Sequence, residues 1–304
     1  DVFGADVYTD EIFMAFHYAQ SVDKLAQTAR SIHPIPLYVN AAMNSRGRKP
    51  GEYPSAGPLA HLIDIWHCGA PHIDLLAPDL YDKGFVDWVA QYKLSNNPLF
   101  IPEIKRSMNN SVQALYVFAE HDAIGFSPFS IEDGSDSPQD PLVQGYGLMK
   151  ELMPVITSNQ GKGVMNGLFF DAQNKERVLQ YDGVKLTCRH YFTLPWDPRA
   201  TDGSIWPEGG GVVLRLSKDE FLIAGNGIVV EFEKADVHSQ TINTKLGEDG
   251  FAYQGGDHAQ QDTSWKGESR VGIGTVDEVS IQTDGSFQYV RRLNGDQTHQ
   301  GRHV

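Results

Sequence analysis

Apolar residues recur at steps of three and four along the first part of the chain, over residues 12–29. This period predicts an amphipathic helix with one buried stripe, for which Thr9 is a suitable N-cap and Pro34 a stop signal. The stripe consists of Ile12, Phe16, Ala19, Val22, Ala26 and Ala29.

Four short apolar runs follow this helix, and each leads into another helical pattern. The runs are residues 36–40, 73–79, 98–103 and 123–128. The last of the following helices is expected to begin at Pro141 with Asp140 as its cap, since proline suits the first helical position. Nearly continuous apolar strands that alternate with helices are typical of a parallel sheet covered on both faces. The pattern predicts four βα units, which belong either to a TIM barrel or to a doubly wound sheet.

The rest of the chain has a different pattern. Residues 157–304 hold 20 of the 30 glycines and show no helical period. Short β-rich runs at residues 212–216, 220–224 and 228–232 are separated by Gly-rich turns, one of them at residues 224–227, which predicts hairpins. The expected fold class is therefore α/β followed by β. We place an α/β domain at residues 1–160 and an antiparallel, β-sandwich-like domain at residues 161–304.

Composition and charge exclude several classes of protein. Hydrophobic residues make up 40% and charged residues 21% of the chain, as in a globular protein. The net charge of −14 would repel a nucleic-acid backbone, and no apolar stretch approaches the roughly 18 to 20 residues of a membrane span. The histidines and the two cysteines lack metal-ligand spacing, and no Gly-rich phosphate loop follows a strand. We expect no metal, no cofactor, and neither nucleic acid nor membrane as a partner.

The two ends of the sequence suggest a fragment. The chain starts at Asp1 without Met or a leader and ends at Val304 without a polar tail. We expect a piece cut at both ends, whose sequence does not report the compartment, although a secreted or periplasmic protein would fit.

Polar residues follow the predicted apolar strands, and Glu103 is the foremost of them. In a βα barrel the catalytic groups lie at the carboxyl ends of the strands. A carboxylate that closes an apolar strand loses hydration unless it is hydrogen-bonded or used, so Glu103 is a candidate catalytic residue. The alternative is that Glu103 only caps the next helix. Tyr81 either orients Glu103 by a hydrogen bond or lies at the rim of the sheet.

The other strand ends supply candidate substrate contacts. Asn40 ends the first strand, and Asp79 either contacts substrate or makes an Asx turn. Phe126 and Phe129 are candidates for stacking on a sugar ring, because sugars present apolar C–H faces to aromatic rings. Trp66 has the same chemistry, but its place on a helical stripe favours core packing.

Several segments resemble a known enzyme family. The segments YTDEIFMAFHYA, LYVN, IDLLAPDLY, LFIPE and AIGFSPF begin at residues 8, 37, 73, 99 and 123. They resemble the second half of the catalytic barrel of glycoside hydrolase family 35 β-galactosidases. GVVLRL, EFLIAG and RRLNGDQTHQGRH begin at residues 211, 220 and 291, and they resemble an uncharacterised β-rich domain that follows the barrel in part of that family.

The resemblance implies a fold and a mechanism. The four strands would be the fifth to eighth of a TIM barrel, and the protein would hydrolyse terminal β-galactosides with retention of configuration. Glu103, at the end of the seventh strand, would be the nucleophile, and Tyr81 would correspond to the aromatic residue or histidine that hydrogen-bonds it.

The sequence departs from the family in one respect, because it contains no Asn-Glu pair, the family's signature of the acid/base. We expect that glutamate upstream of Asp1, and we do not assign its role to Glu11, Glu120 or Glu132. The open half-barrel would then need another chain, either a complementary N-terminal half or a further copy. Two other hypotheses remain: a catalytically silent carbohydrate-binding fragment, and a doubly wound protein that binds another small molecule.

Overall fold

The computed structural model describes residues 4–134, 137–194, 197–235, 245–246, 252–253 and 275–293. The chain divides into two compact units. The first comprises Asp1–Gly167 with Val212–Leu214, and the second comprises Leu168–Gly211 with Arg215–Val304.

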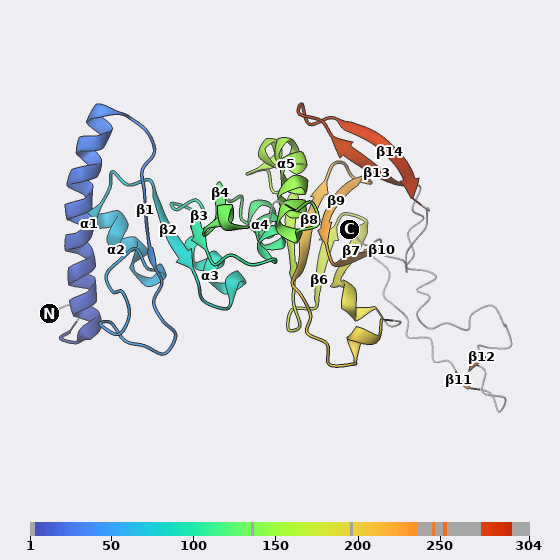
Figure 1. The fold of residues 1–304 in the computed structure, drawn as a ribbon, viewed down its shortest axis with the longest axis horizontal. Helices are drawn as coiled ribbons and strands as arrows, with labels where there is room; N and C mark the ends of the chain where they lie inside the picture. Colours follow the sequence, from blue (N-terminus) through green and yellow to red (C-terminus); the bar gives the residue numbers. More distant parts are fainter. Residues whose placement is uncertain are drawn as a thin grey trace. The chain divides into compact units, whose positions relative to one another are not determined.

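The first unit contains a four-stranded parallel sheet with strand order β1-β2-β3-β4 (Figure 1). A long helix precedes the sheet, and a helix follows each strand, so the four predicted βα units are confirmed. The sheet is open, and the described residues form no closed barrel. The strands are β1 (Tyr38–Ala42), β2 (Leu75–Leu80), β3 (Phe100–Ile104) and β4 (Gly125–Pro128). The helices are α1 (Val7–Ile32), η1 (Ala60–Leu62), α2 (Ile63–Gly69), α3 (Phe85–Tyr92), α4 (Asn110–Glu120), η2 (Ile131–Asp133) and α5 (Pro141–Asn159).

Helix α1 begins earlier than the sequence pattern indicates. Its N-cap is Asp6, whose carboxylate accepts hydrogen bonds from the backbone N–H groups of Tyr8 and Thr9 at 2.9 and 3.0 Å. The prediction of Thr9 as the cap is therefore wrong: a carboxylate three residues upstream satisfies the free N–H groups, and Thr9 lies inside the helix. The cap predicted for α5 is confirmed, since Asp140 accepts from the N–H of Leu142 at 2.8 Å.

The buried face of α1 is also displaced from the predicted stripe. Its buried residues are Glu11, Ala15, Ala19 and Ala26, whereas Ala29 is exposed. The reason is close packing against α2, because a Cβ added to Gly69 would lie 2.7 Å from the Cβ of Ala19. Small residues let the backbones of α1 and α2 approach closely. Their positions, and not those of the larger apolar side chains, therefore determine which face of α1 is buried.

The two faces of the parallel sheet differ in polarity. Leu76, Leu80, Ile101 and Ile104 are at most 4% exposed and form one face of the core, packed beneath the helices. The opposite face carries polar and partly exposed side chains at the carboxyl ends of the strands. The fold thereby presents a polar surface where the sequence pattern placed candidate chemistry.

A local irregularity in β3 decides the face on which Glu103 lies. Ile101 pairs with Phe126 and Ile104 pairs with Pro128, so β3 has one more residue than β4 between these pairs. In a regular strand Glu103 would share the buried face of Ile101, because side chains alternate. The extra residue between Ile101 and Ile104 shifts the alternation, and Glu103 pairs with Asp79 on the polar face.

The β-rich part of the chain contains two three-stranded sheets, with orders β5-β8-β9 and β10-β7-β6, and a hairpin of β13 and β14. The boundary between the units falls within β5 and β8. The helical turns η3 (Tyr191–Thr193) and η4 (Pro198–Ala200) follow β7, and β11 (Lys245–Leu246) pairs with β12 (Ala252–Tyr253). The remaining strands are β5 (Met165–Phe170), β6 (Glu176–Tyr181), β7 (Val184–His190), β8 (Gly209–Arg215), β9 (Phe221–Asn226), β10 (Ile228–Lys234), β13 (Val276–Ile281) and β14 (Phe287–Leu293).

The Gly-rich segment at residues 224–227 does not form the predicted hairpin turn. Strand β9 belongs to one sheet and β10 to the other, so the chain crosses between sheets at Gly227, whose φ is +69°. The carbonyl of Gly227 accepts from the N–H of Tyr191 at 2.8 Å, and a Cβ on Gly209 would approach the same oxygen to 2.8 Å. Glycine is used here because the backbones meet closely and φ is positive.

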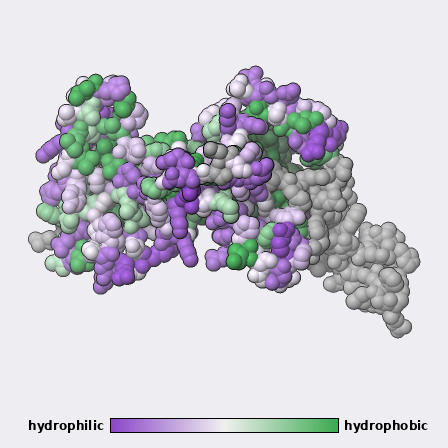
Figure 2. All heavy atoms as spheres, in the orientation of Figure 1, coloured by the Kyte–Doolittle hydropathy of each residue, from purple (hydrophilic) through white to green (hydrophobic). Residues whose placement is uncertain are grey.

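Two further observations concern the surface and the C-terminal motif. Helix α1 exposes Phe13, Leu25 and Ile32 by 64%, 72% and 80%, and hydrophobic atoms stand among hydrophilic ones on this helix in Figure 2. No helix within the described part of the chain has the length and apolar character needed to cross a membrane.

The motif that begins at residue 291 lies outside the described residues from 294 onward.

Candidate functional site

Three neighbouring strands bring together Asn40, Asp79 and Glu103, although Asn40 lies in the middle of β1 and does not end it, since this strand continues to Ala42. Asp79 of β2 lies directly beside Glu103 of β3 in the sheet register. The side-chain amide of Asn40 donates to Oδ1 of Asp79 at 2.6 Å. Two carboxylates and an amide thus form a polar row across the end of the sheet. Three residues predicted separately from their strand-end positions are brought into one cluster.

Tyr81 joins this row through its hydroxyl group, which donates to Oε1 of Glu103 at 2.5 Å. Partial burial, this hydrogen bond and the negative charges of Glu103 and Asp79 raise the pKa of Tyr81 to about 12. The phenol therefore stays protonated and acts as a donor that fixes one oxygen of Glu103. The second oxygen remains available to another group.

Asp79 is electrostatically linked to its neighbour. Burial raises its pKa, the hydrogen bond from Asn40 opposes this effect, and the charge of Glu103 raises the pKa further. The net direction is upward from the ordinary value of 3.8. The negative charge of Glu103 on the adjacent strand therefore favours the protonated form of Asp79.

The two aromatic candidates differ in burial. Phe126 pairs with Ile101 on the buried face and is 8% exposed, so it is not brought to Glu103. Phe129, immediately after β4, is 55% exposed, and its N–H donates to the carbonyl of Ile104. Trp66 is 3% exposed and donates from its indole to Ala56, which confirms its expected place in the core.

A second group of residues borders the polar row, and the sequence pattern did not reveal it. Arg46, in the loop after β1, donates from Nε to Asp82 at 2.7 Å and from Nη2 to the carbonyl of Lys83 at 2.8 Å. The indole of Trp88 donates to the same oxygen of Asp82 at 3.0 Å. Asp82 follows Tyr81 directly, so the two neighbours link Glu103 to Arg46. The available signal was the basic run at residues 46–49.

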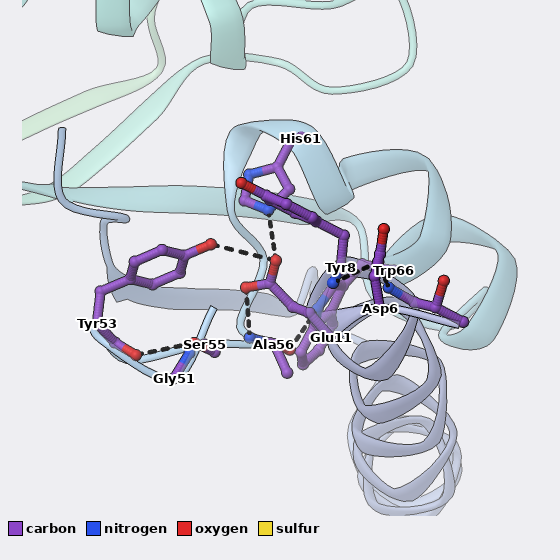
Figure 3. A network of polar contacts seen from close by, with 10 residues as sticks. Asp6, Tyr8, Glu11, Gly51, Tyr53, Ser55, Ala56, His61 and Trp66 are labelled. Atoms are coloured by element: carbon purple, nitrogen blue, oxygen red, sulfur yellow. Dashed lines mark hydrogen bonds and ion pairs between the residues drawn. The ribbon is translucent and has the colours of Figure 1, made fainter. Parts of the chain in front are cut away.

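A third polar cluster, shown in Figure 3, centres on Glu11 of α1. Glu11 is 2% exposed and accepts from Tyr53 at 3.2 Å, from His61 at 2.8 Å and from the N–H of Ala56 at 3.3 Å. Ala56 has a φ of +67°, a backbone conformation that is costly for alanine. Glu11 therefore anchors the loop after β1 to α1. Its signal in the sequence is that Glu11 precedes Ala15 and Ala19 at steps of four residues, which places it on the same helix face as these small residues.

The histidines, cysteines and acids do not combine into an evident metal centre. Within the ranges that the structure describes, no group of three or more such side chains is placed to hold a metal ion. Cys68 and Cys188 are both free thiols, and burial raises the pKa of Cys188 to about 12.

Comparison with known families gives a match in the C-terminal part of the chain. Residues 142–304 match the model of a family described as a domain of unknown function, DUF5597. The matched segment is 163 of the 304 residues, which is more than half. The chain belongs to the DUF5597 family. No curated protein matches it.

The DUF5597 match and the candidate site occupy different parts of the sequence. The match begins at Leu142, in the first turn of α5, whereas Asn40, Asp79, Tyr81 and Glu103 all precede it. Membership of the DUF5597 family therefore assigns no role to the site, and its chemistry must be argued from its own geometry.

Proposed function

We propose that this DUF5597 protein is a retaining glycoside hydrolase that acts on terminal β-galactosides, with Glu103 as the nucleophile. The observation that carries the proposal is the hydrogen bond from Tyr81 to Glu103 at the carboxyl end of a parallel strand. It holds a carboxylate in one orientation on the polar face, as a nucleophile requires. The preference for galactose rests on the resemblance of the strand segments to family 35 β-galactosidases.

The strand order supports a barrel over a doubly wound sheet. The four strands are neighbours in chain order, with no reversal. A doubly wound sheet binds its ligand where the strand order reverses, and the described sheet has no such point. In the proposed enzyme these strands are the fifth to eighth of a TIM barrel, and the polar row lies at its catalytic end.

The proposed reaction has two steps. Glu103 attacks the anomeric carbon while an acid protonates the leaving oxygen, which gives a covalent galactosyl-enzyme. Water then attacks that carbon, and the same acid acts as a base and removes the proton from the water. We assign the acid/base to a glutamate that lies outside residues 1–304. Asn40 and Asp79 would bind sugar hydroxyl groups beside Glu103.

The test is the substitution Glu103→Gln in the full-length protein that contains residues 1–304. Hydrolysis of an aryl β-galactoside should fall by about a thousandfold or more, since the nucleophile is lost. A 2-fluoro-galactoside should form an adduct on the peptide that contains Glu103. Glu132→Gln, in the loop after β4, serves as the matched control. Unchanged turnover in the Glu103→Gln variant would remove the assignment.

A silent carbohydrate-binding protein is the second candidate. It is favoured by the lack of an Asn-Glu pair in these 304 residues. Such a protein would bind β-galactosides with measurable affinity, yet the fluorinated sugar would leave Glu103 unlabelled. The labelling experiment therefore separates the two candidates.

A further inference from the structure

Basic residues gather in the loops that follow β1, β2 and β3. Residues 1–167 contain 11 Lys and Arg residues, and six of these lie in the loops at residues 43–59, 81–84 and 105–109. The same loops contain two acidic residues, Glu52 and Asp82, so their net charge is 6 − 2 = +4 in a chain of −14. The six are Arg46, Arg48, Lys49, Lys83, Lys105 and Arg106. The loop after β4, residues 129–140, contains four acidic residues and no basic one, so the positive charge is confined to the loops that follow β1, β2 and β3.

Arg46 is the member of this group with the most described contacts, whereas Arg106 donates to the carbonyl of Ser130 at 2.7 Å. Besides the hydrogen bonds of Arg46 to Asp82 and Lys83, its guanidinium carbon lies 5.5 Å from the centroid of the Trp88 ring. Gly84 has a φ of +84°, and a Cβ on it would collide with Nη2 of Arg46. Carboxylate, carbonyl, indole face and glycine together hold the guanidinium in one place.

The held guanidinium keeps donors for a ligand. The Arg46 side chain is 56% exposed, and among the described residues it donates only from Nε and Nη2. An arginine has five N–H donors in a planar fork that matches a carboxylate or a sulfate. Asp82 follows Tyr81 directly in the chain, so the guanidinium bound to Asp82 is connected to Glu103 through two adjacent residues. A pre-ordered arginine loses little freedom when it binds an anion.

We propose that Arg46 is a specificity-determining residue that binds an anionic group, a carboxylate or a sulfate ester, on the sugar unit next to the bond that Glu103 cleaves. This inference rests on the proposed glycosidase function and adds the class of substrate. Arg46 makes the direct contact with the anionic group. Asp82 orients Arg46 and leaves part of its charge for the ligand.

The test compares three β-galactosyl disaccharides, whose second unit is glucose, glucuronate or 6-sulfoglucose. The ratio of kcat/KM for an anionic substrate to that for the neutral one should exceed unity and should fall about tenfold in Arg46→Gln, the loss of one charged hydrogen-bond contact. Arg46→Lys keeps the positive charge but lacks the planar fork of N–H donors. Its ratio of kcat/KM values should therefore lie between that of the unaltered protein and that of Arg46→Gln. Comparison of the glucuronate and 6-sulfoglucose disaccharides shows whether the preferred anion is a carboxylate or a sulfate ester. Lys24→Ala on α1 is the control and should leave the ratio unchanged.

Failure of this inference is distinct from failure of the proposed function. Equal kcat/KM values for neutral and anionic disaccharides, or a ratio insensitive to Arg46, would overturn the inference while leaving hydrolysis at Glu103 intact. If no disaccharide is hydrolysed, calorimetric binding of the same three compounds replaces the kinetic ratio. Tighter binding of the glucuronate and 6-sulfoglucose disaccharides than of the neutral one, lost in Arg46→Gln, supports the inference. Equal affinity for the three compounds, or no binding, overturns it.

Discussion

The contact between Tyr81 and Glu103 couples a proton on one side chain to a charge on the other. A hydrogen bond of 2.5 Å from a phenol to a carboxylate stabilises the neutral phenol as well as the orientation of the acid. The pKa of Tyr81, raised to about 12, reflects burial first, then the hydrogen bond to Glu103 and the negative charges of Glu103 and Asp79.

Replacement of Glu103 by Gln should lower the pKa of Tyr81 from about 12 toward its ordinary value of 10. The charge is lost, although a hydrogen-bond acceptor remains. An NMR titration with ring-labelled tyrosine would measure the change, and Tyr81→Phe would assign the resonance. A pKa that stays at about 12 in the variant would show that burial alone accounts for the shift.

The same coupling sets a pH dependence of stability. An unfolded tyrosine ionises near pH 10, whereas folded Tyr81 stays neutral to about pH 12. The contact therefore contributes fully to stability below pH 10, and this contribution is lost as the pH rises from about 10 to about 12.

Strand-end residues could be found from the sequence, but their neighbours in loops and helices could not. Glu103 and Asp79 followed from polar residues that close apolar strands, since parallel strands end at one edge. Arg46 and Glu11 were not identified from the sequence because their roles depend on contacts between residues 36 and 50 positions apart. A local pattern of hydrophobic and polar residues carries no information on such contacts. Phe126 was misplaced for the same reason, because its face depends on pairing with β3.

Among the elements, the crossing of α1 and α2 depends on small residues. Gly69 of α2 faces Ala19 of α1, and an added Cβ would lie 2.7 Å from the alanine Cβ and 3.0 Å from the carbonyl of Phe16. The backbone carbonyl cannot move aside cheaply. The crossing therefore has no room for a methyl group.

Gly69→Ala should destabilise the protein by roughly 1 to 3 kcal/mol, the usual cost of overpacking. Gly147→Ala provides the matched control, because this glycine lies inside α5 with no atom within 4 Å of an added Cβ. The control should gain roughly 0.5 to 1 kcal/mol from better helix propensity. Urea unfolding measures the free energy of unfolding of both variants. A gain of stability in both would contradict the close approach of α1 and α2 at Gly69.

The bulge in β3 makes an equally specific prediction. Deletion of Pro102 would place Glu103 directly after Ile101, so regular alternation should keep the carboxylate on the face opposite Ile101. The pKa of Tyr81 should therefore stay raised in this variant, as it should in Pro102→Ala, which keeps the residue count. An NMR titration of Tyr81 measures both variants, and a pKa near 10 in the deletion variant would show that Glu103 needs the extra residue to meet Tyr81.

Whole elements were more predictable than their connections. The four parallel strands and their helices followed from alternating periods, and Asp140 and Pro141 marked the start of α5. The crossing at Gly227 looked like a hairpin turn, because a glycine with positive φ serves both purposes. Only the pairing partners of β9 and β10 distinguish a turn within a sheet from a passage between sheets.

At the scale of the molecule, each of the two units has its own buried core. Leu115 of α4 is 1% exposed in the first unit, and Leu186 of β7 is fully buried in the second. Leu186→Ala should therefore cost roughly 2 to 5 kcal/mol. Amide exchange should quicken in β6, β7 and β10, with β3 unaffected. Leu115→Ala should give the opposite distribution, and equal acceleration in both units would contradict separate cores.

The extra residue in β3 also affects how relatives of this protein should be compared. Three steps, and not two, separate Ile101 from Ile104 opposite Phe126 and Pro128, so Pro102 and Glu103 together lie opposite Ser127. A relative that lacks the extra residue would keep a carboxylate on the polar face only if the residue lost is the proline and not the glutamate. A sequence alignment of such a relative should therefore place its gap at Pro102 and keep the glutamate beside Asp79.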